Sequence, residues 1–142
     1  MRMLNSKELE LLPDSKIPIR IAFIKPNGVP NVMSLWFEQI DGKIYCATQK
    51  SAKIISHLKN NSACGFEIAT DKPPYKGIRG EGTVKIIDNG TEILDILIAK
   101  YLGEKESTLS KYLKTNSHTE VAIEITVQKI FSYDYSKRMK DV

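Results

Sequence analysis

The chain has 142 residues, of which 42% are hydrophobic, 27% charged and 8% aromatic, and its formal net charge at pH 7 is +4. These values are typical of one globular domain, and with only two cysteines they exclude a disulfide scaffold, a fibre and a disordered tail. The longest stretch without a charge, residues 26–37, is too short for a membrane-spanning helix, which needs about 20 apolar residues. We therefore expect a single domain over residues 1–142 that does not act in a membrane.

Charge placement narrows the classes of partner. Only four of the 21 basic residues are arginines, and the lysines are spread along the whole chain. This distribution is typical of a solvated surface rather than a nucleic-acid interface, which more often clusters its basic residues. The segment after Met1 reaches Lys7 and Glu8 without the apolar core of a secretory signal, so we expect a cytoplasmic protein.

The first third of the chain predicts a helix followed by strands. A short opening helix is expected at about residues 5–12, because Asn5 and Glu8 form a capping-box pattern ahead of several leucines. Alternating apolar residues predict a strand over residues 17–23. A hairpin turn at Asn27–Gly28 should then reverse the chain.

Two further strands are expected directly after that turn. The first covers Val32 to Glu38, and a turn at Asp41–Gly42 leads into the second, Lys43 to Thr48. With the strand before them, they predict an antiparallel meander of three strands.

The rest of the chain alternates between helix and strand patterns. Glycines 77, 80 and 82 fall inside one expected strand, where they indicate a backbone kink or a close approach of another segment. About six strands with helices inserted at two points predict a mainly β protein, a small β-barrel. The expected elements are a helix from Ser51 to Asn61, strands 64–69 and 77–87, helices 93–102 and 108–114, and a final strand 121–135.

Catalytic motifs are absent from the sequence. His57 and His118 lie outside any metal-binding spacing, and no nucleophile elbow or phosphate-binding glycine loop occurs. Cys46 and Cys64 also lack the spacing of zinc ligands, so we expect each to be a reduced, buried side chain. No catalytic residue and no metal site is predicted.

One local arrangement predicts an anion site. At the start of the expected helix, free backbone N–H groups meet the hydroxyl of Ser51 and the ammonium groups of Lys50 and Lys53, which suits a phosphate. The alternative is an ordinary Ser N-cap with solvated lysines. The strand Val32–Phe37, which contains Trp36, the only tryptophan, is expected nearby. A flat ring with a phosphate tail would fit this pair of features.

These residues together resemble a known family, the pyridoxamine 5′-phosphate oxidase-like flavin-binding split barrel. The resemblance covers about residues 15–136, and its strength lies in the order and spacing of the pieces. They are Gly28, Pro30, Val32 and Leu35–Phe37, then Asp41–Gly42, Ile44, Tyr45 and Thr48, then Ser51, Lys53 and Asn60–Asn61, then Tyr75 to Gly82, and finally Ser132 to Lys137.

The resemblance implies a six-stranded antiparallel split barrel that forms a homodimer, with flavin mononucleotide (FMN) at two sites along the interface. It implies that the strand of Val32 lies against the flavin ring, that the end of the next strand borders the ribityl chain, and that the loop at Tyr75 closes over the flavin. Ser51 and Lys53 match the phosphate-binding pair. The implied cofactor-binding residues are Val32, Met33, Ser34, Trp36, Ala47, Thr48, Lys50, Ser51, Lys53, Tyr75 and Lys76.

Two departures from the family pattern bear on the reaction. Ala52 stands where pyridoxamine phosphate oxidases carry an arginine, and the tail Phe131–Arg138 has no tryptophan and a single arginine. We therefore expect an FMN-dependent oxidoreductase acting on another small molecule, not a true pyridoxamine phosphate oxidase. The alternatives are a reductase that uses the deazaflavin coenzyme and a flavin carrier or sensor without turnover. A nucleic-acid-binding barrel is the weakest alternative, because Lys76–Gly80 lacks aromatic residues for base stacking.

Overall fold

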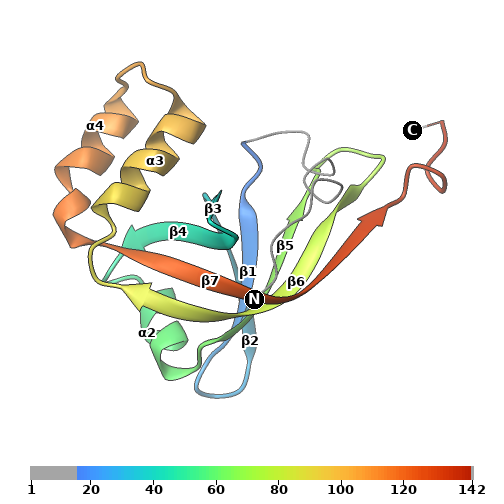
Figure 1. Cartoon of the computed structure of the whole chain (residues 1–142), viewed down its shortest axis with the longest axis horizontal. Coiled ribbons are helices and arrows are strands. Elements are labelled where there is room, and N and C mark those ends of the chain that lie inside the picture. Colours follow the sequence, from blue (N-terminus) through green and yellow to red (C-terminus); the bar gives the residue numbers. More distant parts are fainter. Residues whose placement is uncertain (1–15, 142) are drawn as a thin grey trace.

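The computed structural model describes residues 16–141. The predicted helix at residues 5–12 lies outside this range. Within the range the chain forms one antiparallel sheet with three helices (Figure 1). The elements are β1 (Ile19–Ile24), β2 (Pro30–Leu35), β3 (Glu38–Ile40), β4 (Lys43–Gln49), α2 (Lys53–Asn60), β5 (Ala63–Ala69), β6 (Lys76–Ile87), α3 (Thr91–Leu102), α4 (Thr108–Thr115), a 3-10 turn (Ser117–Thr119) and β7 (Glu120–Asp134).

The sheet has seven strands in the order β2-β1-β5-β6-β7-β4-β3. Its two edge strands, β2 and β3, are separated in sequence only by Trp36 and Phe37. Because two residues span such a short distance, the edges of the sheet must return close to one another, and the sheet curls into a barrel. The two edges are not hydrogen-bonded to each other, so the barrel is split between β2 and β3.

The expected meander of three strands is wrong. β2 pairs with β1 and β3 pairs with β4, so the predicted strand Val32–Glu38 is two strands in two different hairpins. The break falls where Phe37 is buried and Trp36 stacks on Tyr101 of α3. These packing contacts take the chain out of one hairpin and into the next, and they make the number of strands seven rather than six.

The core fills the inside of the curled sheet. β1 contributes Ile19 and Ile21, and β7 contributes Ile123 and Ile125, all without measurable exposure. Full burial of such a side chain stabilises the fold by about 1.5 to 3 kcal/mol. The apolar face of α2, at Ile54, Ile55 and Leu58, is buried in the same core.

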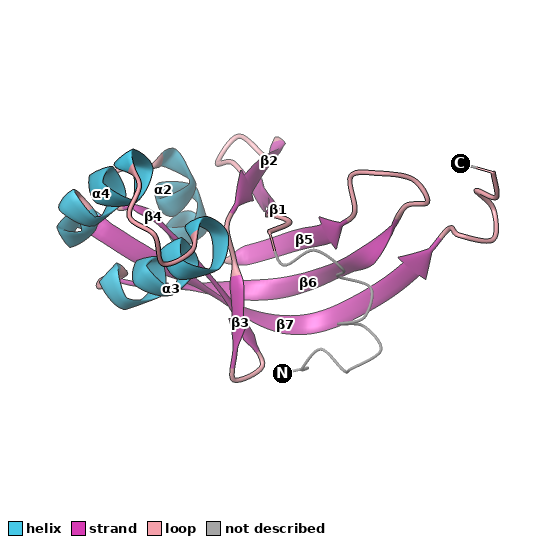
Figure 2. Ribbon diagram, turned by 90° about the horizontal axis from the view of Figure 1, so that it is seen from above, coloured by secondary structure: helices cyan, strands magenta, loops and turns pink. Residues whose placement is uncertain are grey.

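The helices gather at one end of the sheet, whereas β5, β6 and β7 extend beyond them (Figure 2). α3 packs against β4 and β7 through its buried face, which includes Leu94 and Leu97. α4 begins with a capping box, in which Ser107 and Ser110 satisfy each other's backbone N–H groups. α3 therefore covers the outer face of the sheet where β7 begins.

Within residues 16–141 no helix combines the length and apolar character that a membrane crossing requires.

The glycines of β6 allow the close approach that the sequence predicts. A Cβ at Gly80 would collide with the ring of Phe66 and would lie 2.7 Å from the carbonyl oxygen of Lys129. A Cβ at Gly82 would lie 2.7 Å from the carbonyl oxygen of Thr126. The register of β6 against β7 also shifts between Glu81 and Gly82, as expected for a bulge.

Candidate functional site

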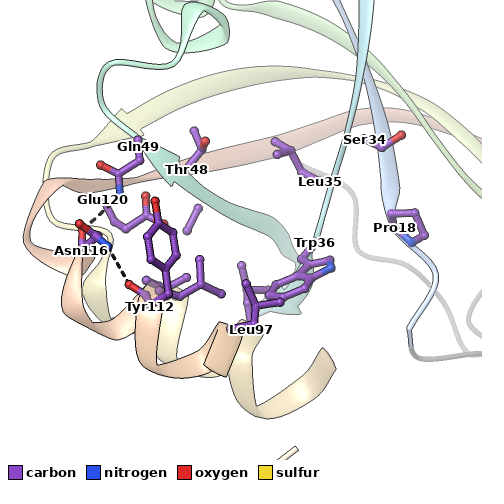
Figure 3. Close-up of a pocket in the computed structure, with 14 residues that line it drawn as sticks. Pro18, Ser34, Leu35, Trp36, Thr48, Gln49, Leu97, Tyr112, Asn116 and Glu120 are labelled. Atoms are coloured by element: carbon purple, nitrogen blue, oxygen red, sulfur yellow. Dashed lines mark hydrogen bonds between the residues drawn. The ribbon is translucent and has the colours of Figure 1, made fainter. Parts of the chain in front are cut away.

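The main cavity lies between two strands of the barrel and the α3–α4 hairpin (Figure 3). Its volume is about 710 Å³, enough for a small organic molecule. β2 and β4 form one wall. The helices form the other wall with Leu94, Leu97, Leu109, Leu113 and Tyr112, so the lining is mainly apolar.

Four of the predicted site residues line this cavity. Ser34 and Trp36 come from β2 and the residue after it, and Ala47 and Thr48 come from the end of β4. The indole of Trp36 stacks on Tyr101, with ring centroids 5.0 Å apart and an interplanar angle of 7°. The orientation of the indole at this cavity is therefore fixed by α3.

A second hollow of about 750 Å³ follows the other half of β2 and the start of α2. It is lined by three more predicted residues, Val32, Met33 and Lys53, and by Lys25 and His57. β2 thus lines both hollows, with residues 31–33 in one and residues 34–35 in the other. From Val32 to Trp36 the extended chain covers about 13 Å at the usual rise per strand residue.

The start of α2 presents an uncapped helix end with positive charge around it. The helix begins at Lys53, its N-cap is Ala52 without a side-chain hydrogen bond, and its first turn holds no acidic residue. The alternative reading of Ser51 as an ordinary N-cap is therefore wrong. Lys50, Ser51 and Lys53 are exposed, and in the part of the chain that the structure describes neither lysine forms an ion pair.

Tyr75 lies apart from these residues. It lines a third hollow of about 330 Å³ with Arg79 and Tyr133, where the Arg79 guanidinium is 2.7 Å from Glu67 and 4.4 Å from the centre of the Tyr133 ring. Lys76 begins β6, and it lines none of these three hollows; the same is true of Lys50 and Ser51. The structure of the single chain therefore does not bring Tyr75 or Lys76 to the cavity beside Trp36.

Glu120 lines the main cavity and was not predicted from the sequence as a site residue. Its side chain is 5% exposed, and its Oε2 atom has no hydrogen-bond partner among the described residues. Burial raises the pKa of this carboxyl. In the sequence Glu120 continues the outward-facing positions of β7 together with Glu124, so the pattern predicts an exposed residue. It is buried because the α3–α4 hairpin covers this end of the strand.

The two cysteines have the properties expected of inert side chains. Both are buried and free. Burial raises the pKa of Cys46, and it raises the pKa of Cys64 to about 11 despite a hydrogen bond from the backbone of Gly82. Neither thiol is therefore a nucleophile near neutral pH.

Among residues 16–141, no group of three or more His, Cys, Asp or Glu side chains is arranged to hold a metal ion.

Comparisons with known proteins give matches in structure but not in sequence. No protein-family model matches the chain, and no curated protein matches it. Three solved structures illustrate the match in fold.

The first is an F420 reductase with a TM-score of 0.74 and 18% identity over 90% of this chain and 98% of its own. A Listeria innocua protein assigned as a pyridoxamine 5′-phosphate oxidase has a TM-score of 0.66 and 16% identity over 89% and 94% of the two chains. An FAD-binding protein from Mesorhizobium loti has a TM-score of 0.65 and 16% identity over 94% and 95%. At these identities the match is one of fold, and it confirms the fold that the sequence resemblance implies: the chain is a split barrel of the pyridoxamine 5′-phosphate oxidase-like type.

Proposed function

We propose that the chain binds FMN along β2, with the phosphate at the start of α2 and the flavin ring beside the strand and Trp36. One observation carries this proposal. β2 lines both hollows, and the two differ in chemistry, since one has the uncapped helix end with Lys53 and the other has mainly apolar walls. FMN has the matching pair of ends, a charged phosphate and a flat ring system.

The residues at both ends fit the cofactor. An uncapped helix N-terminus attracts an anion through its free N–H groups and its dipole, and an unpaired lysine adds a charge-assisted hydrogen bond. At the other end Trp36 presents an aromatic side chain held in place by Tyr101. Ser34 and Thr48 supply hydroxyl groups for the polar part of the ligand.

The reaction that we propose is an electron transfer to or from a small molecule. A bound flavin would supply the hydride chemistry. The chain itself would bind the cofactor, hold its ring in one orientation and exclude water from the cavity, which requires little acid-base chemistry from side chains. That division of labour agrees with the absence of a catalytic motif from the sequence.

We propose a homodimer as the functional unit. β2 is an edge strand, and Val32 on it is 61% exposed, which is unusual for a valine in a strand. A second copy that covered β2 would enclose the proposed flavin. The region around Tyr75 and Tyr133 of the second copy could then border the flavin bound to the first copy, as the resemblance implies for the loop at Tyr75.

The deazaflavin coenzyme is the second candidate for the cofactor. The F420 reductase among the matched structures favours it, since that protein has this fold over nearly its whole length. Ala52 and the tail without tryptophan, in contrast, argue against pyridoxamine phosphate as the substrate. A flavin carrier or sensor would use the same binding residues and lack turnover.

An absorbance spectrum and mass identification of the molecule that copurifies with the protein test the cofactor. We expect FMN, or the binding of added FMN with a flavin spectrum. A protein that binds neither FMN nor the deazaflavin coenzyme contradicts the proposal. Oxidation of reduced nicotinamide or of reduced deazaflavin by the loaded protein separates an enzyme from a carrier, and the mass of the particle in solution tests the homodimer.

A further inference from the structure

Glu120 places a carboxyl group in the wall of the main cavity without a partner from the described part of the protein. Its Oε2 atom is buried and receives no hydrogen bond from residues 16–141. Among the described residues that line this cavity there is no lysine or arginine, and Glu120 is the one charged side chain. A carboxyl group in such a place lacks the compensation that buried charges normally have.

The neighbouring amide groups of Gln49 and Asn116 donate hydrogen bonds to other acceptors. Gln49 donates from its Nε2 atom to the carbonyl oxygen of Asn116 at 3.1 Å, and Asn116 donates from its Nδ2 atom to the carbonyl oxygen of Tyr112 at 2.8 Å. The hydroxyl of Thr119 donates to Oε1 of Gln49, which holds that amide in place. Figure 3 shows Gln49, Asn116 and Glu120 side by side at this end of the cavity. These two amide groups therefore donate to backbone oxygens and not to Glu120.

The remaining lining of the cavity indicates the shape of a ligand that could donate a hydrogen bond to Glu120. Leucines of α3 and α4 face the wall made by β2 and β4, and Trp36 and Tyr112 add aromatic surface. A ligand that fills this space needs an aromatic or aliphatic body. At the Glu120 end it needs a group that donates hydrogen bonds to a carboxylate.

We propose that Glu120 binds a nitrogen-bearing aromatic ligand, whose amine or amidine group donates to the carboxylate while its ring lies among the apolar residues of the cavity. A cationic nitrogen suits this site best, because it replaces the lost solvation of the carboxylate with a charge-assisted hydrogen bond. The inference rests on the cavity and on Glu120, and it concerns the Glu120 end of the same cavity whose Trp36 end we assign to the flavin ring under the proposed function.

Benzamidine is a suitable probe, because it joins a flat ring to a planar cation with paired N–H donors. We expect it to bind the purified full chain in a titration calorimeter or by ligand-observed NMR, and we expect benzoate, which has the same ring and the opposite charge, not to bind. Glu120→Gln should lower the affinity for benzamidine by roughly tenfold or more, because it removes a charge-assisted hydrogen bond.

Glu124→Gln is the matched control. Glu124 lies on the same strand and is already held by Lys43 and Tyr45 outside the cavity, so its replacement should leave benzamidine affinity unchanged. Equal affinity of the wild type and the Glu120→Gln variant, or no binding to the wild type, overturns the proposal. Neither outcome bears on the phosphate end of the proposed FMN site, which lies in the other hollow at Lys53 and is tested with flavins.

Thermal unfolding separates a binding role from a structural one. A buried carboxyl group whose only partner is a ligand lowers the stability of the ligand-free protein. Glu120→Leu should therefore raise the melting temperature while it abolishes benzamidine binding. A lower melting temperature for Glu120→Leu, together with unchanged benzamidine affinity for Glu120→Gln, means that Glu120 is structural and refutes the assignment.

Discussion

The rings of Trp36 and Tyr101 stack in parallel at 5.0 Å, although 65 positions separate the two residues in the chain. The hydroxyl of Tyr101 donates to the carbonyl oxygen of Ile17 at 2.9 Å and accepts from the N–H of Phe37 at 3.2 Å. One side chain of α3 thus holds the start of the first hairpin and the point where the chain leaves β2. The split in the barrel and the orientation of the Trp36 indole depend on the same contact.

Tyr101→Phe should therefore destabilise the protein while keeping the stacked ring. It leaves a buried N–H and a buried carbonyl without their partner, which costs about 1 to 3 kcal/mol in the free energy of unfolding. Urea denaturation measures the change. Tyr112→Phe is the control, since that ring is 65% exposed and should change the free energy of unfolding by less than about 0.5 kcal/mol. Equal effects of the two substitutions would show that the Tyr101 hydroxyl is not structural.

Two glycines on the neighbouring strands β5 and β6 give a second test of the fold. Gly80→Ala should destabilise by about 1 to 3 kcal/mol, because the new methyl group collides with Phe66 and with the backbone at Lys129. At Gly65 a Cβ would have its nearest neighbours at 3.7 Å, an ordinary contact, so Gly65→Ala should be close to neutral. Thermal melts of both variants make the comparison, and a Gly80→Ala protein as stable as the wild type would mean that the two strands separate there at little cost.

Local sequence patterns predicted most of the elements correctly. Alternation in β1 and β7 and the helical stripe of α3 are signals that come from neighbouring residues, and the fold class followed from them. The hairpin of β1 and β2 was expected from Asn27–Gly28, but the break of the expected strand Val32–Glu38 into β2 and β3 could not be predicted in this way. It depends on where Trp36 and Phe37 pack, and their partner Tyr101 lies on a helix far along the chain.

The site shows the same limit. The lysines and Ser51 could be proposed as a phosphate site because helix starts and cations are visible in sequence, and the strand of Val32 could be proposed from its apolar run. Glu120 was missed, since its position alternates as a surface residue should, and its burial is imposed by the α3–α4 hairpin. Tyr75 lies apart from the cavity beside Trp36, and we propose that it joins the site only from a second chain, which no pattern within one chain can specify.

Lys53→Ala tests the phosphate end of the proposed FMN site. It should lower the affinity for FMN by roughly 10- to 100-fold, because a hydrogen bond to a charged group contributes about 1.5 to 3 kcal/mol. Riboflavin has no phosphate, so its affinity should change little. Flavin fluorescence titration measures both ligands, and Lys59→Ala, an exposed lysine in the last turn of the same helix, controls for net charge. An equal loss for FMN and riboflavin would remove Lys53 from the phosphate site.

Two glutamates of β7 should respond to pH in opposite directions. Burial would raise the pKa of Glu124, but its hydrogen bonds from Lys43 and Tyr45 outweigh burial and lower that pKa below the ordinary value of 4.5. A lowered pKa in the folded state means that ionised Glu124 stabilises the protein above pH 4.5 and that this contribution is lost as the pH falls through the lowered pKa. Glu124→Gln should thus cost about 1 kcal/mol at pH 7 and nearly nothing in strong acid.

For Glu120 the sign is reversed, because burial alone raises its pKa above 4.5. The folded protein then holds the proton more tightly than the unfolded chain, so ionised Glu120 destabilises the fold above its raised pKa, and the penalty disappears as the pH falls toward 4.5. Glu120→Gln should accordingly be more stable than the wild type by about 1 kcal/mol at pH 8 and equal to it in strong acid. Urea denaturation of the three proteins across this range measures both effects. A Glu120→Gln protein that is less stable than the wild type at pH 8 would show that the ionised carboxylate already has a donor in the free protein, and Glu120 would then need no ligand.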